Sequence, residues 1–311
     1  MRLLILVNPN ASGGEEAMPR LKERFDSEPD AELVAVETPD EMLNALDERG
    51  PEADRIVLGG GDGTISSMLP KLLKLKKPLG VLPLGTANDF ARTLSLPEDP
   101  IEAVEVAIGP RTHLIDVGMV NDHPFINVAS VGVASKVSEL QSKDLKRSFR
   151  VLSYAMSFRE AIRDAKPFSV SMTLDDHNHW RGMVHQVSVG NGRFHGGGLV
   201  VAEDAAIDDG KLHIYVVRPG TFLDLAASVA SLKFGLGGER ETLKRRAAET
   251  VRLTTSRPRH INIDGDIRST TPAEFSVARR ALEVAIPSEL PPHQRGLVDV
   301  DESRASEESE V

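Results

Sequence analysis

The chain has 311 residues, of which 40% are hydrophobic and 27% are charged, as in an ordinary soluble globular protein. Its 47 acidic residues outnumber its 37 basic ones and give a net charge of −10, which argues against nucleic-acid binding by bulk electrostatics. Because the chain has no cysteine, disulfides, thiolate metal sites and a cysteine nucleophile are excluded. A reducing cytoplasm fits this composition, although the composition does not require it.

The first third of the chain alternates strand-like and helix-like segments. Strands are predicted at Leu3–Val7, Glu32–Glu37, Arg55–Leu58 and Leu79–Pro83, and helices at Glu15–Asp26, Pro39–Glu48 and Thr64–Leu75. The strands are continuous apolar runs rather than alternating ones, which is typical of a parallel sheet covered by helices on both faces. We therefore expect residues 1–115 to form an α/β domain with a parallel sheet.

After about Arg111 the pattern changes to short strands with local turns. Strands are predicted at Val117–Val120, Phe125–Val128, Phe168–Leu174, Trp180–Val189, Leu212–Val217, Thr250–Thr255, His260–Ile263 and Ala281–Ile286. This pattern predicts a mainly antiparallel β-sandwich domain over residues 116–290, with helical interruptions near Lys143–Arg163 and Phe222–Phe234. Residues 291–311 are acidic and almost without apolar side chains, so we expect a disordered tail.

The segment LGGGDGT at residues 58–64 is the most informative part of the chain. Glycine lets the backbone turn tightly and approach a ligand. Successive N–H groups of that kind form a concavity suited to phosphate. Asp62 is the exception, because a carboxylate repels phosphate unless a cation or a substrate proton lies between them. The segment indicates nucleotide phosphate and Mg²⁺ chemistry, and the plain alternative is a glycine-rich turn between a strand and a helix.

Two further loops belong with this one. Asn8-Pro9, Gly59–Thr64 and Leu84–Asn88 each follow a predicted strand. In open parallel sheets ligands bind beyond the carboxyl ends of the strands, so we expect the three loops to form one site. Neither a GxxxxGK[ST] loop nor a GxGxxG turn after the first strand is present, which disfavours ordinary P-loop and Rossmann enzymes.

Six motifs in order resemble the diacylglycerol kinase catalytic-domain family, which includes bacterial lipid kinases, sphingosine kinases and ceramide kinases. They are NPNASGG at 8–14, GGDGT at 60–64, PLGTANDFAR at 83–92, GNG with GGG at 190–198, DDGKL at 208–212 and DGD at 264–266. GGDGT alone is shared with NAD kinases and phosphofructokinases. The other motifs, in the right order over roughly residues 3–286, favour the lipid-kinase family.

The resemblance implies an ATP site at the ends of the first strands, in an N-terminal domain that binds the nucleotide. It places nucleotide contacts at Asn8, Gly13, Thr38, Gly59, Gly60, Gly61, Asp62, Gly63, Thr64 and Thr86. Backbone N–H groups of the glycine loop would hold phosphate, and the Thr86 hydroxyl would donate to a phosphate oxygen.

The resemblance also implies how the carboxylates divide the chemistry. Phosphoryl transfer needs positioned phosphates, a cation and a base for the attacking hydroxyl. Asp62 and Asp89 would belong to a carboxylate–water–Mg²⁺ network at the transferred phosphate. Asp266 would be the general base, although the family usually has glutamate there, and its reach is shorter by about 1.5 Å. Asp264 is interpreted as a turn-forming residue of an Asp-Gly hairpin.

A second, structural Mg²⁺ site is implied around Asp208-Asp209-Gly210. Its expected ligands are the Asp209 carboxylate and backbone carbonyls near Ala206 and Lys211. The alternative at this position is an Asp-Gly turn without a metal.

Together these observations predict a cytoplasmic, ATP- and Mg²⁺-dependent lipid kinase. Its acceptor would be diacylglycerol, a sphingoid base or a related lipid, with transient contact at a membrane surface, and exposed edge strands make a homodimer plausible. One alternative is an NAD-kinase-like enzyme that phosphorylates a soluble acceptor. The other is a non-catalytic nucleotide- or lipid-binding regulator, because Asp266 replaces the usual glutamate and the first glycine turn has no lysine.

Overall fold

The computed structural model describes residues 1–133, 166–200, 202, 205–221, 224, 227–228, 231–232 and 241–288. The predicted helix near Lys143–Arg163 and the predicted acidic tail lie outside the described residues. Of the segment Phe222–Phe234, the described residues are helical and the others lie outside the description. Among the described residues no helix has the length and apolar character needed to cross a membrane.

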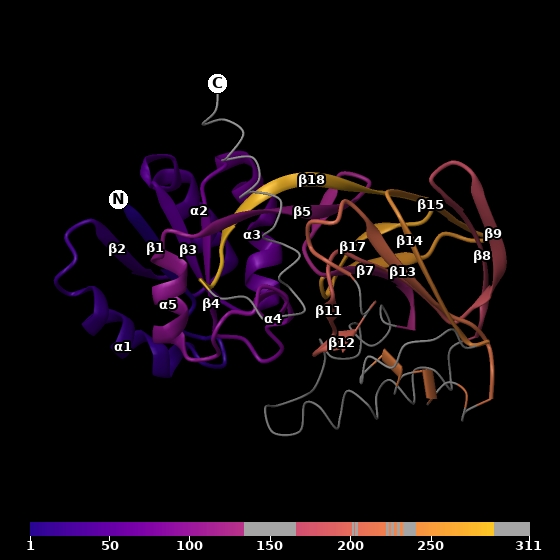
Figure 1. The fold of residues 1–311 in the computed structure, drawn as a ribbon, viewed down its shortest axis with the longest axis horizontal. Coiled ribbons are helices and arrows are strands. Elements are labelled where there is room, and N and C mark those ends of the chain that lie inside the picture. Colours follow the sequence, from indigo (N-terminus) through magenta and orange to yellow (C-terminus); the bar gives the residue numbers. More distant parts are fainter. Residues whose placement is uncertain are drawn as a thin grey trace, which may run out of the picture.

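The N-terminal half is a parallel sheet with the strand order β2-β1-β3-β4 (Figure 1). Its strands are β1 (Leu3–Val7), β2 (Ala31–Ala35), β3 (Arg55–Gly60) and β4 (Leu79–Pro83). Its helices are α1 (Gly14–Phe25), α2 (Pro39–Glu48), α3 (Asp62–Leu75), α4 (Asp89–Thr93) and α5 (Pro100–Ile108), with a 3₁₀ turn η1 (Gly50–Glu52). All seven elements predicted in this third are confirmed within a few residues. The two short helices α4 and α5 were not predicted.

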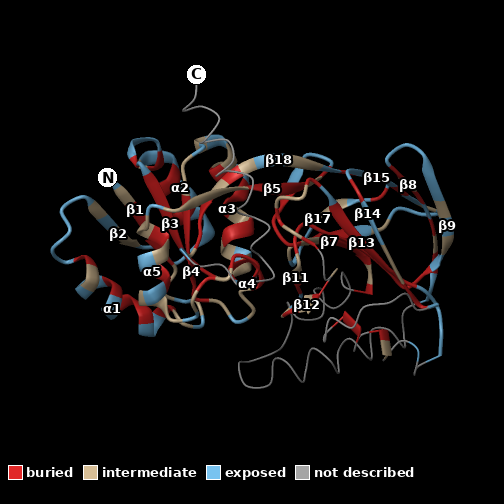
Figure 2. Ribbon diagram, viewed as in Figure 1, coloured by how far each residue is buried: buried red, intermediate tan, exposed pale blue. Residues whose placement is uncertain are grey.

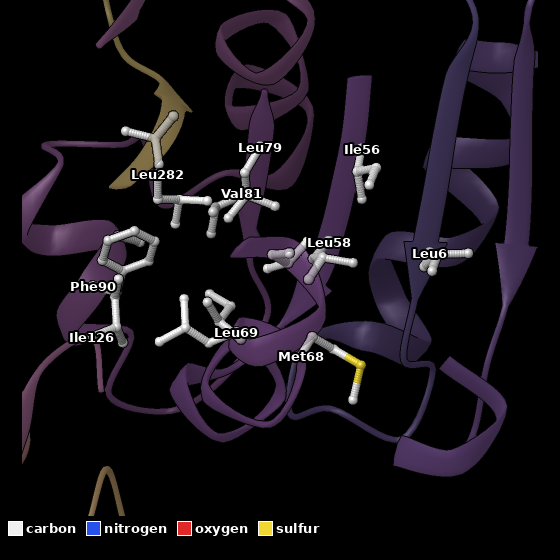
Figure 3. Close-up of a cluster of buried hydrophobic side chains, with 14 of the residues drawn as sticks. Leu6, Ile56, Leu58, Met68, Leu69, Leu79, Val81, Phe90, Ile126 and Leu282 are labelled. Atoms are coloured by element: carbon white, nitrogen blue, oxygen red, sulfur yellow. The ribbon is translucent and has the colours of Figure 1, made fainter. Parts of the chain in front are cut away.

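The continuous apolar strands are explained by burial on both faces of the sheet. Leu4 and Leu6 of β1 belong to one core cluster with α2 and α3, whereas Ile5 and Val7 belong to another with α1 and α5. Figure 2 shows these strands as the buried interior of the N-terminal half. The first cluster extends toward the other half of the protein, because it includes Phe90, Ile126 and Leu282 (Figure 3).

The C-terminal half is a β-sandwich. One layer is an antiparallel sheet of six strands in the order β14-β13-β10-β7-β16-β17, and the other contains β18-β15-β8-β9 and continues into the parallel sheet. The strands are β5 (Thr112–Val120), β6 (His123–Phe125), β7 (Val128–Gly132), β8 (Phe168–Leu174), β9 (Asn178–Val184), β10 (Gln186–Gly190), β11 (Phe194–His195), β12 (Leu199–Val200), β13 (Leu212–Val217), β14 (Leu243–Ala248), β15 (Thr250–Thr255), β16 (His260–Ile263), β17 (Asp266–Thr270) and β18 (Ala273–Ala285). A core cluster fills the space between the layers. The predicted fold class, an α/β domain followed by a mainly antiparallel β-sandwich, is confirmed.

Two long strands connect the halves. β18 pairs antiparallel with β5 along most of its length, and near its end Val284 pairs in parallel with Leu79 of β4 (Figure 1). The end of the described C-terminal half thus adds a strand to the N-terminal sheet, which brings the two halves into fixed contact.

Two predicted strands span a break between two observed strands, and four strands were missed. The predicted strand at Trp180–Val189 is two strands, because the chain leaves the layer of β9 at His185 and enters the other layer as β10. The predicted strand at Phe125–Val128 lies across the break between β6 and β7. The missed strands are β11, β12, β14 and β17, and the predicted strand at Ala281–Ile286 is only the end of the longer β18. β14 is a charged strand at the edge of its sheet, where alternation of apolar and polar residues is weak.

Candidate active site

The three strand-end loops meet, as the sequence predicts. The Asn8 N–H donates to the Gly59 carbonyl at 2.9 Å, and the Leu84 N–H donates to the Gly60 carbonyl at 3.0 Å. The Gly13 N–H in turn donates to the Leu84 carbonyl at 2.9 Å. These backbone bonds hold the ends of β1, β3 and β4 together at one edge of the sheet.

Close backbone packing makes glycine necessary on one side of this site. A Cβ atom on Gly85 would lie 2.4 Å from the Cα of Gly61, so the two loops touch backbone to backbone. A Cβ atom on Gly63 would meet nothing within 4 Å, so this side of the loop is open. The hydroxyls of Ser12 and Thr86 lie 2.9 Å apart and join the first loop to the third.

A pocket of about 200 Å³ opens beside the glycine loop. It is lined by Asn8, Thr38, Pro39, Met42, Gly63, Thr64, Ser67 and Met68. Four of these residues were predicted from the sequence. Pro39, Met42, Ser67 and Met68 were missed, although Ser67 and Met68 lie three and four residues after Thr64 on α3 and therefore share its helix face.

Two helices begin at this pocket. α3 begins at Asp62, and the Thr64 N–H bonds to the Gly61 carbonyl at 3.0 Å, with no side-chain cap on the first turn. α2 begins after Thr38, whose hydroxyl accepts the Glu41 N–H at 3.2 Å. The first N–H groups of a helix have no partner within the helix, and together they favour a bound anion.

The Asp62 carboxylate accepts three hydrogen bonds, two of them from the N-terminus of α4. Its Oδ2 accepts the Asp89 N–H at 3.0 Å, and its Oδ1 accepts the Phe90 N–H at 2.9 Å. The Oδ1 atom also accepts the Asn127 side-chain amide at 3.1 Å. Asp62 therefore caps α4 and connects it to α3, a role that the sequence did not predict.

The Asp89 carboxylate is buried and joins α4 to the C-terminal half. It accepts the N–H of Gly197 at 2.8 Å and of Gly198 at 2.7 Å, both in the turn between β11 and β12. Burial raises the pKa of Asp89, and the nearby negative charge of Asp62 adds to this, while the two N–H groups and Arg92 oppose it. A residue predicted as a ligand of the Mg²⁺ network thus also connects the two halves of the protein.

Asp264 forms the predicted turn between β16 and β17, with a φ angle of 47°, and does more than turn the chain. Its carboxylate accepts the backbone N–H groups of Ile126, Asn127 and Val128 at 2.8, 3.0 and 2.8 Å. Burial raises the pKa of Asp264, although these three N–H groups act in the opposite direction. Because Asn127 also donates to Asp62, we call Asp62, Asp89, Asn127 and Asp264 the domain joint.

Asp266, the predicted general base, lies outside the domain joint. Its side chain is 63% exposed, and its Oδ2 lies 2.7 Å from Nη2 of Arg268. The same Nη2 atom lies 3.5 Å from the Oγ of Ser67 on the pocket wall. The structure therefore brings Asp266 to the pocket through Arg268, and among the described contacts it has no hydrogen bond to Asp62 or Asp89.

The predicted structural Mg²⁺ site is a compact turn held by other contacts. The Asp209 carboxylate accepts the N–H groups of Lys211 at 2.9 Å and Ala206 at 3.3 Å, and it lies 2.7 Å from Nε2 of His213. Burial would raise the pKa of Asp209, but the His213 partner and these two N–H groups outweigh it and lower the pKa. Ala206 and Lys211 contact Asp209 through N–H groups rather than carbonyls.

Neighbouring side chains reinforce this turn. Asp208 pairs with Nε2 of His113 at 2.8 Å, and the buried Asp116 accepts the N–H groups of Gly210 and Arg280, each at 2.7 Å. Within the described ranges no group of three or more metal-ligating side chains is assembled. The turn as arranged does not fit the predicted direct ligand set, and the metal site there remains a prediction.

Comparisons with known proteins agree with this geometry. The model of the diacylglycerol kinase catalytic domain matches residues 2–120, and that of the YegS C-terminal NAD kinase beta sandwich-like domain matches residues 127–286. A "probable lipid kinase YegS-like" of Pseudomonas fluorescens (strain Pf0-1) is 32% identical over 240 residues, covering 76% of this chain and 77% of the relative. One from Pseudomonas aeruginosa (strain UCBPP-PA14) is 31% identical over 238 residues, covering 76% and 78%.

Among solved structures, a diacylglycerol kinase from Bacillus anthracis str. Sterne superposes with a TM-score of 0.71. It is 22% identical in sequence, and the match covers 92% of this chain and 97% of that one. This likeness supports the fold.

Proposed function

The chain belongs to the diacylglycerol kinase catalytic-domain family of lipid kinases, and from that premise we propose that it transfers the γ-phosphoryl group of ATP to a hydroxyl of a lipid acceptor in a Mg²⁺-dependent reaction. The observation that carries the proposal is the pocket at the start of α3. Residues at the end of β1 and in the first turns of α2 and α3 line it, and the exposed carboxylate of Asp266 lies one side chain away from its wall.

The pocket fits the phosphates of a nucleotide. The first turn of α3 presents backbone N–H groups without a side-chain cap, and the space beside Gly63 is open. Helix N-termini of this kind bind phosphate through those N–H groups and the helix dipole. The amide of Asn8 and the hydroxyl of Thr64 add polar groups on the same wall. In this proposal the phosphates lie along the glycine loop.

The joint carboxylates fit a Mg²⁺ ion bound through water better than one bound directly. A carboxylate offers about four lone-pair positions. Asp62 already uses three of them, and the unused position is on Oδ2. Mg²⁺ usually keeps several waters and takes one or two carboxylates plus substrate phosphates. Asp62 and Asp89 would hold its waters, and the ion would neutralise negative charge on the phosphates.

The residues then divide the reaction as follows. The acceptor hydroxyl oxygen forms the new bond to the γ-phosphorus, and the bond from that phosphorus to the oxygen that bridges to ADP breaks. Asp266 takes the proton that the hydroxyl loses, for which its exposed carboxylate is available. The glycine loop and α3 hold the donor phosphates, and the domain joint keeps α4 and the C-terminal half in place around them.

The proposed acceptor is a membrane lipid such as diacylglycerol, a sphingoid base or a related lipid, reached by transient contact with the membrane surface. The test is incubation of the whole chain with γ-labelled ATP, Mg²⁺ and a lipid extract, followed by separation of organic and aqueous phases. Labelled lipid identified by mass spectrometry, and lost when EDTA removes Mg²⁺, is the expected result. Asp266→Asn serves as the inactive control.

Two other results would overturn the proposal. Label confined to a water-soluble product would indicate an NAD-kinase-like reaction. ATP binding without transfer to any lipid of the panel would indicate a non-catalytic regulator.

A further inference from the structure

The pocket wall carries no charged side chain. All eight lining residues are neutral, and the helix N-terminus supplies only about half a positive charge. A nucleoside triphosphate carries several negative charges, which proteins usually meet with arginine or lysine. A basic side chain from outside the lining is therefore expected beside the first turn of α3.

Arg268 is placed to be that group. It lies on β17 of the C-terminal half, and its Nη2 atom lies 3.5 Å from the Oγ of Ser67, which is on the pocket wall. Ser67 donates its own hydroxyl proton to the Gly63 carbonyl at 2.7 Å, so its oxygen is free to accept from the guanidinium. The side chain of Arg268 is 25% exposed, which leaves it open to a ligand while its position is held.

The backbone of β17 departs from regular strand pairing at Arg268. The pairing of β16 with β17 passes from Ile261–Ser269 to Asn262–Ile267, so Arg268 is the extra residue of a β-bulge. Bulges redirect a side chain out of the regular alternation of a strand and are common beside active sites. Here the redirected side chain contacts both Asp266 and α3.

The other basic side chains close to this region have different partners. Lys71 of α3 is paired with Asp47. The guanidinium of Arg92 lies 5.9 Å from the ring of Phe194 and bonds to the Ala87 carbonyl. Within the described part of the chain, Arg268 is the basic residue with a hydrogen bond to the pocket wall.

We propose that Arg268 binds the phosphates of ATP at the N-terminus of α3, while it holds Asp266 toward the transferred group. The planar guanidinium has five N–H donors in a fixed fork, enough to keep the Asp266 contact and bind phosphate oxygens at the same time. The inference rests on the proposed function and adds to it a nucleotide contact from the C-terminal half. One strand would then supply both the base and the phosphate-binding cation.

The experiment measures the dissociation constants of ATP, ADP and AMP for the whole chain and for Arg268→Gln by calorimetry. Loss of a charge-assisted contact is expected to weaken ATP binding by about 10- to 100-fold. AMP, whose phosphate lies farther from the γ position, is expected to bind as before. Arg268→Lys keeps the positive charge but not the planar fork of N–H donors, so its ATP affinity is expected to lie between that of the unmodified chain and that of Arg268→Gln.

Arg252→Gln is the matched control. Arg252 is a more exposed arginine of the same half, ion-paired with Asp176 and Glu274, and its loss is expected to leave nucleotide binding unchanged. Equal ATP affinity in Arg268→Gln and the unmodified chain would overturn the inference. An equal loss for ATP and AMP would also overturn it, because that pattern indicates a general loss of structure.

The outcomes separate this inference from the proposed function. If Arg268→Gln loses ATP affinity selectively but the unmodified chain phosphorylates no lipid, the arginine assignment stands and the lipid-kinase proposal fails. If the unmodified chain phosphorylates lipid and Arg268→Gln binds ATP normally, the lipid-kinase proposal stands and the arginine assignment fails. An unmodified chain that binds no ATP would overturn both.

Discussion

The domain joint and the edge strand β17 use aspartate in opposite ways. Asp264 and Asp266 lie in one hairpin, yet Asp264 accepts three backbone N–H groups from another segment whereas Asp266 is exposed with a single arginine partner. Asp62 and Asp89 resemble Asp264 in accepting N–H groups from distant parts of the chain. Motif membership therefore does not decide what a carboxylate does; its burial and its partners do.

Physical chemistry explains the division. A carboxylate that loses water on folding is tolerated only when hydrogen bonds replace that water. Asp89 is buried and Asp62 and Asp264 are half-buried, so each is tied to several donors. Replacing such a group leaves buried donors without acceptors. An exposed carboxylate keeps its water and costs the fold little when it is replaced, so it is available to bind a proton during catalysis.

The largest expected effect is a loss of activity at Asp266 on β17, without the loss of stability expected at the domain joint. Asp266→Asn is expected to lower kcat by about 10²- to 10⁴-fold, because an amide does not accept the hydroxyl proton. Its urea denaturation midpoint is expected to match that of the unmodified chain, because the side chain is exposed. Asp266→Glu restores the carboxylate with a longer reach and is expected to retain activity. A kcat that stays unchanged in Asp266→Asn would remove this residue from the base role.

The next effect concerns the joint and is expected to appear in stability. Asp264→Asn places an amide N–H₂ against backbone donors, which is expected to lower the free energy of unfolding by about 1–3 kcal/mol. Activity should fall with it, because Asn127 positions Asp62. Asp176→Asn is the matched control, since Asp176 is also a hairpin aspartate with positive φ but is exposed. Equal stability of the two variants would contradict the comparison.

A third test contrasts the closed and open sides of the glycine loop. Gly85→Ala would force a methyl group to 2.4 Å from Gly61, and such overpacking is expected to cost about 1–3 kcal/mol of unfolding free energy. Gly63→Ala has open space and lies in the first turn of α3, so its stability is expected to stay the same or rise slightly. Urea denaturation of both variants measures the difference, and a costly Gly63→Ala would contradict the open pocket.

The smallest effect is the pH dependence, and its sign differs between two acidic regions. Burial raises the pKa of Asp89 and Asp264, so the folded state holds these protons more tightly and their contribution to stability decreases as pH rises from 3.8 to the raised pKa. The lowered pKa of Asp209 gives the opposite dependence of stability on pH. Its contribution is present above 3.8 and is lost as pH falls through the lowered value.

Melting temperatures measured from about pH 3 to about pH 7, which spans the usual range of carboxyl titration, test this difference. Asp209→Asn is expected to flatten the acid-side loss of stability, and Asp264→Asn to steepen it. A Mg²⁺-dependent rise in the melting temperature that disappears in Asp209→Asn would instead support the metal site predicted there.

The sequence was most informative about the N-terminal half. The predicted elements from β1 to β4 were confirmed because buried parallel strands and their covering helices have strong local patterns. The meeting of the three loops followed from the rule that parallel strands end at one edge of the sheet. Four of the pocket residues were predicted from the resemblance to the family.

The C-terminal half was predicted less well at the points where it forms the site. The bulge at Arg268 and the change of layer at His185 depend on strand pairing, which local sequence does not reveal. Asp264 was interpreted only as a turn residue, since its three partners lie more than 130 residues earlier in the chain.

The sequence by itself determined the order of strands and helices from β1 to β4, the glycine loop at the end of β3 and the family to which the chain belongs. These properties depend on local backbone preferences and on motifs contiguous in the chain. Only the tertiary structure decided that Asp62 caps α4, that Asp89 joins α4 to the C-terminal half, that Asp264 holds the segment from which Asn127 bonds to Asp62, and that Arg268 lies against α3. Each of these depends on a contact between distant segments, where burial and the available donors select the partner.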